Sequence, residues 1–213
     1  MIYNLDIAKQ VAKSLLQINA IILQPNNPFK WAAGWNSPIY CDNRKTLSYP
    51  KIRNYIRQSL VDVIKNHYKG ANVIAGVATA GIPHGVLVAE ELGLPFIYVR
   101  AKAKEHGKQN QIEGYFEKGQ SVILVEDLIS SGKSSLEAAS ALKEVGMKVK
   151  GMVSIFTYGF DTASENFKNA NCEYISLCDY NTLLLEAIKQ KYIDKEDLAI
   201  LKQWRENPSN WKQ

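Results

Sequence analysis

Cysteine is scarce in this sequence, and long apolar runs are absent. The three cysteines, Cys41, Cys172 and Cys178, include no C-x-x-C pair, which argues against a disulfide framework or a zinc site and for reduced, buried thiols. No apolar stretch approaches the length needed to cross a bilayer. The N-terminal segment MIYNLDIAKQVAKSLL has no basic stretch before an apolar run, so it is not typical of a secretion signal. We therefore expect a soluble, cytoplasmic protein with no membrane partner.

A long run of one charge is also absent. Lys and Arg total 26 against 21 Asp and Glu, which gives a net charge of +5 spread along the chain. An enzyme with anionic substrates accounts for this charge as well as nucleic-acid binding does, and we predict no nucleic-acid partner. Hydrophobic residues make up 46% of the 213 residues, enough for a buried core in one domain.

Apolar runs alternate with helical patterns from about residue 50 onward. This arrangement predicts an α/β fold in which helices flank a mostly parallel central sheet. Ligands bind beyond the carboxyl ends of the strands in such sheets. A helix should open the chain, and the C-terminal region should be helical, with Asp194 as an N-cap. The predicted strands are 73–77, 96–99, 122–126, 149–158 and 173–177, with helices near 83–92 and 134–145.

Residues 122–135, VILVEDLISSGKSS, join a buried strand to two acids and a small polar loop. The Gly-Lys-Ser ending is like that of a nucleotide-triphosphate loop, but Asp127 stands where the first glycine of that loop should be, so an NTPase is disfavoured. Paired carboxylates at Glu126 and Asp127 suit two vicinal ribose hydroxyls. The following N–H groups, at a helix N-terminus, suit a phosphate. We interpret the stretch as a ribose 5-phosphate site; the alternative is that the acids merely end a strand and cap a turn.

This stretch resembles the phosphoribosyl-pyrophosphate (PRPP) signature of the type I phosphoribosyltransferase family. The segment 102–114, KAKEHGKQNQIEG, is similar to the mobile catalytic loop of the members that use orotate, and 29–44, FKWAAGWNSPIYCDNR, to their N-terminal hood. Residues 78–85, ATAGIPHG, match the pyrophosphate loop. The resemblance implies a single domain over 1–213, with an N-terminal hood (about 1–48) and a mobile lid loop (about 101–115).

The resemblance also implies an activity. Such an enzyme, a glycosyltransferase, moves the 5-phosphoribosyl group from PRPP to orotate, giving orotidine 5′-monophosphate and pyrophosphate in de novo pyrimidine (UMP) synthesis. Mg²⁺ is the expected cofactor, carried by PRPP and water with no direct protein ligand. A homodimer is expected, with the lid loop shared across subunits.

Site residues follow from the positions that match the family. The catalytic residues implied are Lys104, His106 and Asp127. The PRPP-binding residues implied are Thr79, Ala80, Arg100, Lys104, His106, Glu126, Asp127, Leu128, Ile129, Ser130, Ser131, Gly132, Lys133 and Ser134, and the orotate-binding residues are Ser130, Tyr40 and Arg44.

Each assignment has a plainer alternative. The lid is also compatible with an ordinary solvated loop, and the turn at Thr79 with a simple strand-to-helix connection. Tyr40 is equally compatible with the core and Arg44 with a surface ion pair. His67 and His84 have no acid or cysteine at metal-ligand spacing, so we expect them to be structural.

The chain departs from the family at several positions. Ala32, Ala80 and Ala101 stand where members of the family carry lysine, and Tyr158 where they carry an arginine that holds the carboxylate of orotate. Lys133 stands where glycine is common. These changes leave open which residues hold that carboxylate. Arg44 and Lys102 are the candidates, and Arg44→Ala should then raise the orotate KM far more than the PRPP KM.

Two rival functions are weighed against this one. A phosphoribosyltransferase for another nucleobase is disfavoured by the SPIYCDNR stretch of the hood and the IEG ending of the lid. A non-enzymatic, PRPP-sensing regulator should have lost the cations of the lid and gained a basic helical face or a DNA-binding module. Lys104 and His106 are present, and no such module is visible.

Overall fold

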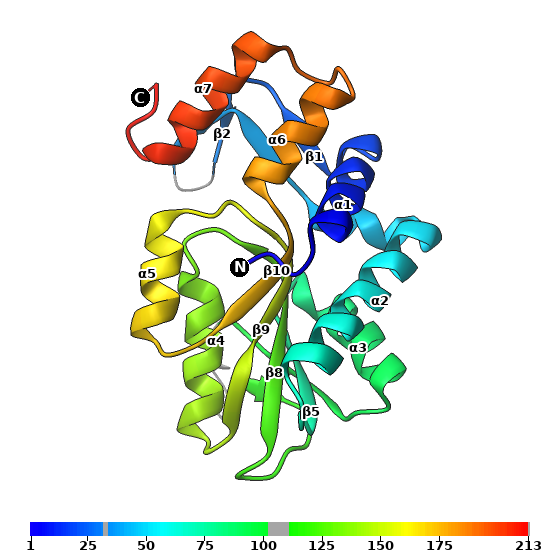
Figure 1. The fold of residues 1–213 in the computed structure, drawn as a ribbon. Helices are drawn as coiled ribbons and strands as arrows, with labels where there is room; N and C mark the ends of the chain where they lie inside the picture. Colours follow the sequence, from blue (N-terminus) through cyan, green and yellow to red (C-terminus); the bar gives the residue numbers. More distant parts are fainter. Residues whose placement is uncertain (32–33, 102–110, 213) are drawn as a thin grey trace.

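The computed structural model describes residues 1–31, 34–101 and 111–212. A six-stranded sheet with the order β10-β9-β8-β5-β6-β7 forms its centre (Figure 1). All neighbouring strands are parallel except the pair β6 and β7. The predicted α/β fold is therefore confirmed. The strands are β5 (Val73–Val77), β6 (Phe96–Val99), β7 (Ile112–Glu113), β8 (Ser121–Ile129), β9 (Lys148–Thr157) and β10 (Tyr174–Asp179).

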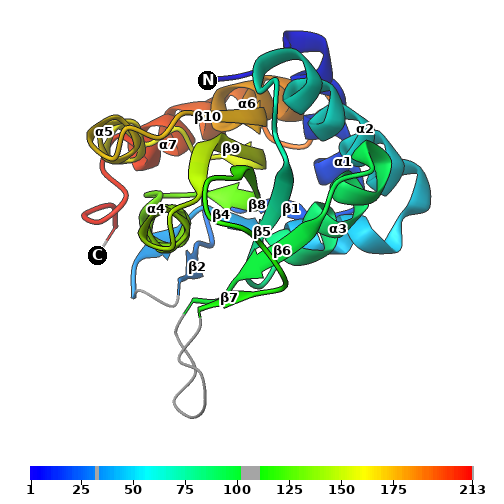
Figure 2. The same cartoon turned by 90° about the horizontal axis from the view of Figure 1, so that it is seen from below.

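Helices cover both faces of this sheet. Figure 2 shows α2 and α3 on one side and α4 and α5 on the other. Alternate residues of β8 join different cores: Ile123 packs with the α1 and α2 side, and Leu124 with Ala138 of α4. A strand buried on both faces reads as a continuous apolar run, which is why the sequence indicates a parallel sheet. The helices are α1 (Leu5–Gln17), α2 (Pro50–His67), α3 (Gly81–Leu92), α4 (Lys133–Glu144) and α5 (Asp161–Asn169).

The strand order reverses next to β5. From β5 the chain passes to β6 on one side and then to β8 on the other, so β5 and β8 are neighbours with connections leading in opposite directions. In open α/β sheets such a switch point leaves a crevice at the carboxyl ends of the two strands. The pyrophosphate loop predicted after β5 and the acid pair predicted in β8 both lie at this point.

Small antiparallel elements and the C-terminal helices lie together above this edge (Figure 1). The ring of Trp31 lies 5.5 Å from that of Trp204, and Asn26 Nδ2 donates to Asp197 Oδ1 at 3.4 Å. The predicted hood, 1–48, is therefore joined by a C-terminal segment that the sequence did not assign to it. These elements are β1 (Ile21–Leu23), β2 (Phe29–Lys30), β3 (Asn36–Ser37), β4 (Ile39–Cys41), the 3₁₀ helix η1 (Asn43–Ser48), α6 (Tyr180–Lys189) and α7 (Lys195–Glu206).

Element boundaries differ from the predictions by a few residues. Strand β8 continues past the predicted 122–126 to Ile129 because β9 pairs with it as far as Thr157. Helix α3 begins at Gly81, two residues earlier than predicted. Asp194 caps α7 in a capping box with Asp197, as expected. No helix in the described ranges is both long and apolar enough to span a membrane.

The three cysteines are free thiols; Cys172 and Cys178 are buried, whereas Cys41 is partly exposed. Burial raises the pKa of the Cys178 thiol well above its usual range, so this thiol stays protonated and unreactive. This agrees with the structural role expected of the cysteines.

Candidate active site

The loop after β8 is held by contacts that only glycine permits at its centre. Gly132 has φ +78°, and a Cβ there would lie 2.6 Å from Cε2 of Phe167. Asn166 Nδ2 donates to the carbonyl of Ser131 at 3.0 Å. No side chain caps α4, which begins at Lys133. The first N–H groups of α4 and its dipole are therefore available to an anion in the loop.

The two acids of β8 lie in different environments. Glu126 is buried, with 6% exposure; its Oε2 accepts from Ser135 Oγ at 3.0 Å and its Oε1 from the N–H of Asp127 at 3.0 Å. Burial, together with the nearby charge of Asp127, raises the pKa of Glu126 well above its usual range. The interpretation as two equivalent ribose acceptors did not anticipate that Glu126 is covered by its own neighbours.

Asp127 is partly exposed and lies beside η1. Asn43 Nδ2 donates to the carbonyl of Asp127 at 2.7 Å, which fixes the end of β8 against the predicted hood. Burial raises the pKa of Asp127, while the bond from Glu126 and the charge of Arg44 oppose this rise. Of the two acids, Asp127 therefore has the carboxyl group that is more open to a ligand.

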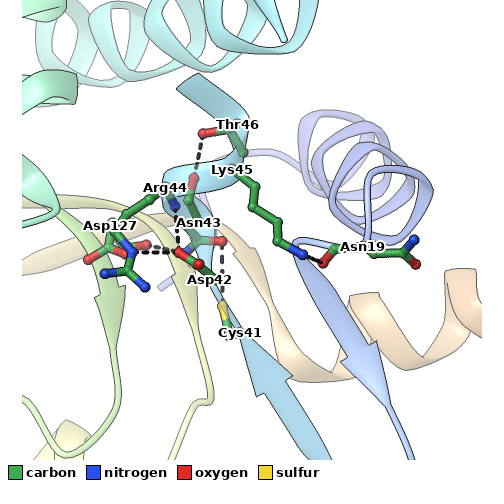
Figure 3. A network of polar contacts seen from close by, with 8 residues as sticks. All are labelled: Asn19, Cys41, Asp42, Asn43, Arg44, Lys45, Thr46 and Asp127. Carbon is green, nitrogen blue, oxygen red and sulfur yellow. Dashed lines mark hydrogen bonds and ion pairs between the residues drawn. The ribbon is translucent and has the colours of Figure 1, made fainter. Parts of the chain in front are cut away.

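Arg44 belongs to a polar network around the turn CDNRKT (Figure 3). Its Nε lies 2.6 Å from Oδ1 of Asp42, and this bond lowers the pKa of Asp42. Lys45 Nζ donates to Asn19 O at 2.9 Å, and Thr46 Oγ1 to Asn43 O at 2.6 Å. The ion pair with Asp42 matches the plainer alternative for Arg44, and the network holds Arg44 close to Asp127 (Figure 3).

The turn after β5 packs directly against β8. A Cβ on Gly81 would lie 2.3 Å from Val125 O and 3.3 Å from Cα of Glu126, so backbone meets backbone here. The peptide bond between Ala78 and Thr79 is cis. The close contact of Gly81 with β8 brings Thr79 and Ala80 to the strand end that carries the acids, where the pyrophosphate loop is predicted.

Arg100 follows β6 at the same edge of the sheet. Its N–H donates to Gln111 O at 2.8 Å, and its Nη1 lies 3.7 Å from Glu113 Oε1. These contacts join the two described ends of the predicted lid loop. Lys104 and His106, together with Lys102, lie outside the described residues.

A cavity of about 360 Å³ lies between the end of β8 and the predicted hood. It brings together Tyr40 and Ser130, two of the three residues assigned to orotate; Arg44 does not line it. Tyr158 lines it too, although its side chain is only 2% exposed and stacks on Phe160 at 5.3 Å. Among the described residues, the cavity is lined by Lys30, Trp31, Tyr40, Cys41, Leu128, Ser130 and Tyr158.

A second cavity of about 370 Å³ adjoins the first, since Trp31 and Ser130 line both. Arg205 of α7 lines the second cavity, and its Nη1 donates to Gly159 O at 2.8 Å. Neither Lys30 nor Arg205 was singled out from the sequence. Lys30 stands two residues before Ala32 in the sequence, where members of the family carry a lysine, and this could have indicated the former; no local pattern indicates the latter.

Comparisons with known proteins agree with this geometry. The sequence matches the phosphoribosyl transferase domain family over residues 46–180. An orotate phosphoribosyltransferase of Cytophaga hutchinsonii is 54% identical over 98% of this chain and 100% of its own length. A counterpart of the same name from Listeria innocua is 51% identical over 97% and 99%.

Solved structures give the same result. The fold is similar to UMP synthase of Leishmania donovani, with a TM-score of 0.79 and 26% identity over 93% of this chain and 42% of that one. It is also similar to the orotate phosphoribosyltransferase of Aeropyrum pernix, with a TM-score of 0.75 and 26% identity over 86% and 99%. The predicted fold and family are confirmed, and the chain belongs to the orotate phosphoribosyltransferase family.

Proposed function

We propose that this chain transfers the 5-phosphoribosyl group of PRPP to orotate, releasing pyrophosphate and giving orotidine 5′-monophosphate for pyrimidine synthesis. One observation carries the proposal: Ser130 belongs to the phosphate loop and also lines the cavity with Tyr40. A ribose 5-phosphate held by that loop therefore has its base-bearing carbon beside the cavity, so sugar and base meet at one strand end.

The PRPP side of the site uses local groups. The N–H groups of residues 131–134 bind the 5′-phosphate, because an uncapped helix N-terminus favours an anion. Asp127 accepts hydrogen bonds from the ribose hydroxyls, and buried Glu126 orients Asp127 through its N–H. The turn at Thr79 and Ala80, with Arg100, faces the pyrophosphate. Holding the ribose in one orientation lowers the barrier by the usual effect of positioning.

Magnesium fits the donor set at this site. The groups available are carboxylate and hydroxyl oxygens, which Mg²⁺ prefers, and this ion keeps several waters and binds mainly through substrate phosphates. Within the described ranges, no group of three or more His, Cys, Asp and Glu side chains is placed to hold a metal. We propose that PRPP brings the ion, with Asp127 close to its waters. When bound, Mg²⁺ neutralises negative charge on the leaving pyrophosphate.

The base side of the site is a cavity whose lining includes three aromatic residues, Trp31, Tyr40 and Tyr158. Tyr40 and Trp31 offer ring faces to a planar pyrimidine, and the Ser130 hydroxyl offers a hydrogen bond. The tilted contact of Tyr40 with Phe29, at 5.6 Å, supports the position of the tyrosine ring.

The lid completes the proposal. Lys104 and His106 would meet negative charge that grows on the departing pyrophosphate, where fixed cations contribute most. The homodimer that shares this lid and the cytoplasmic location remain predictions from the sequence.

The test follows the loss of orotate absorbance with PRPP and Mg²⁺ for the wild type and Lys104→Ala. We expect consumption that requires both PRPP and Mg²⁺ and falls by roughly 100-fold or more in the variant. Lys69→Ala is the matched control, since this exposed lysine precedes β5, at the opposite edge of the sheet. PRPP binding without orotate consumption would instead indicate another base or a sensor.

A further inference from the structure

The proposed base carries a carboxylate, and the position expected to hold it is occupied by Tyr158. The Tyr158 ring is enclosed by aromatic neighbours, with Trp204 at 5.6 Å and Phe160 at 5.3 Å. Burial raises the pKa of Tyr158 well above its usual range. The raised pKa keeps this phenol neutral, and since a tyrosine carries no positive charge, an anion bound here needs a cation from another element.

Arg205 is held at the same strand end from a different part of the chain. Its Nη1 donates to the carbonyl of Gly159, the residue directly after Tyr158, at 2.8 Å. The Arg205 side chain lines the cavity that shares Trp31 and Ser130 with the base cavity. The guanidinium of Arg205 therefore contacts the residue that follows Tyr158, the position at which members of the family carry their arginine.

The position of Arg205 is fixed by its helix. Trp204, the preceding residue, is fully buried and packs on Trp31 at 5.5 Å. In the described part of the chain Arg205 takes part in no ion pair. The bond to Gly159 uses one of the five N–H donors of the guanidinium, which leaves others to form the two-pronged contact that a carboxylate accepts.

We propose that Arg205, from the C-terminal helix α7, binds the carboxylate of the base together with Ser130; this inference rests on the proposed function. Asp161 and Glu206 line the same cavity as Arg205 and Ser130, so repulsion requires a bound carboxylate to lie nearer to Arg205 and Ser130 than to these two acids. The C-terminal helix would then be a specificity element of the active site.

The other described cations near the cavities are less suited to this role. Arg44 is bound to Asp42 at 2.6 Å and lies beside Asp127. Lys30 lines the base cavity but is exposed. A hydrated, flexible ammonium loses more entropy on fixing a ligand than a guanidinium that is already tied to the backbone.

The first experiment measures KM for orotate and for PRPP in Arg205→Gln, Arg205→Lys and Lys202→Gln. Lys202 lies on the same helix and is exposed; it shares a third cavity with Arg205 but lines neither of the two cavities of the site, so it is the matched control. Loss of a charge-assisted pair should raise the orotate KM roughly 10- to 100-fold in Arg205→Gln. The PRPP KM should stay within about two-fold, Arg205→Lys should recover part of the loss, and Lys202→Gln should match the wild type.

The second experiment compares dissociation constants for orotidine 5′-monophosphate and UMP, which differ by the carboxylate. Arg205→Gln should weaken binding of the first and leave that of UMP unchanged, a pattern that a merely misfolded site does not give. Equal loss for both ligands, or an orotate KM that rises in Lys30→Gln but not in Arg205→Gln, would overturn the role of Arg205 while leaving the reaction intact. A wild type that neither consumes orotate nor binds its nucleotide would overturn both proposals.

Discussion

The part of the PRPP site proposed for the ribose 5-phosphate comes from one unbroken stretch, 126–135, whereas the base side gathers Lys30, Tyr40, Ser130 and Tyr158 from distant parts of the chain. The first is a strand, a loop and a helix start, whose geometry follows from local rules. The second exists only when the predicted hood and the C-terminal helices pack together. A part of a site that is formed by one local segment can be predicted from a sequence motif. A part that is formed by the packing of distant segments can be described only once the fold is known.

The two sides also differ in what holds them. Around the phosphate loop, backbone lies against backbone at Gly81 and a ring against backbone at Gly132. Around the base cavity, aromatic side chains pack on one another, and the rings of Trp31, Tyr158 and Trp204 are in mutual contact. Backbone contacts tolerate no added atom, while side-chain packing adjusts more readily. We therefore expect the PRPP side to be the more sensitive to small substitutions.

The largest effect is expected for Gly81→Ala. An added Cβ would lie 2.3 Å from Val125 O, so α3 must move away from β8, which should reduce the free energy of unfolding by roughly 3 kcal/mol or more. Gly93→Ala is the control: Gly93 ends the same helix with φ +64° and open space around it, and should lose only about 1 kcal/mol. Urea denaturation measures both. Equal losses would show that the close contact at Gly81 is easily relaxed.

Asp127→Asn is expected to act on the PRPP side alone. Removing the charge of the more open acid should lower kcat/KM for PRPP by roughly 100-fold, with a much smaller change in the KM for orotate. Glu126→Gln should lower kcat/KM for PRPP by less, because the carboxyl group of Glu126 is already bound by Ser135 and by the N–H of Asp127. Steady-state kinetics at saturating orotate test this order, and the reverse order would assign the ribose to Glu126.

The stability of the PRPP side should depend on pH through His84. This side chain is 1% exposed in the first turns of α3, and burial lowers its pKa from 6.5 to about 4. The unfolded chain therefore binds more protons than the folded one below pH 6.5, and stability falls as the pH is lowered toward 4. Between pH 7 and pH 5 this amounts to about 2 kcal/mol.

His84→Leu should remove most of that pH dependence. Denaturant unfolding at pH 7 and pH 5 measures this pH dependence. His67→Gln, which replaces an exposed histidine, is the control and should retain the pH dependence of the wild type. An unchanged pH dependence in His84→Leu would place the acid sensitivity in other groups, such as the carboxylates around Asp42.

The limits of the sequence follow the same division. The motif at residues 122–135 predicted the strand, the position of the two acids at its end and the loop that follows, which contains Ser130. Tyr40 and Ser130, both predicted to bind orotate, line one cavity, whereas Arg44 lies with Asp42 and Asp127 outside it. Arg205 could not be found by pattern because it is far from Gly159 in the chain and is brought there only by the packing of Trp204 on Trp31. The hydrogen bond from Ser135 to Glu126 likewise forms only when α4 packs against β8.

Ser130 is where the two sides meet, so its variants give the smallest but most discriminating effect. It belongs to the loop by sequence and to both cavities by position. If its hydroxyl serves the base, Ser130→Ala should raise the orotate KM by roughly three- to ten-fold, the usual cost of one neutral hydrogen bond, with the PRPP KM unchanged. Ser130→Thr keeps the hydroxyl and should remain near the wild type. A rise confined to the PRPP KM would move Ser130 to the phosphate side. The base would then depend on the packed elements alone, with Arg205 as its main polar contact.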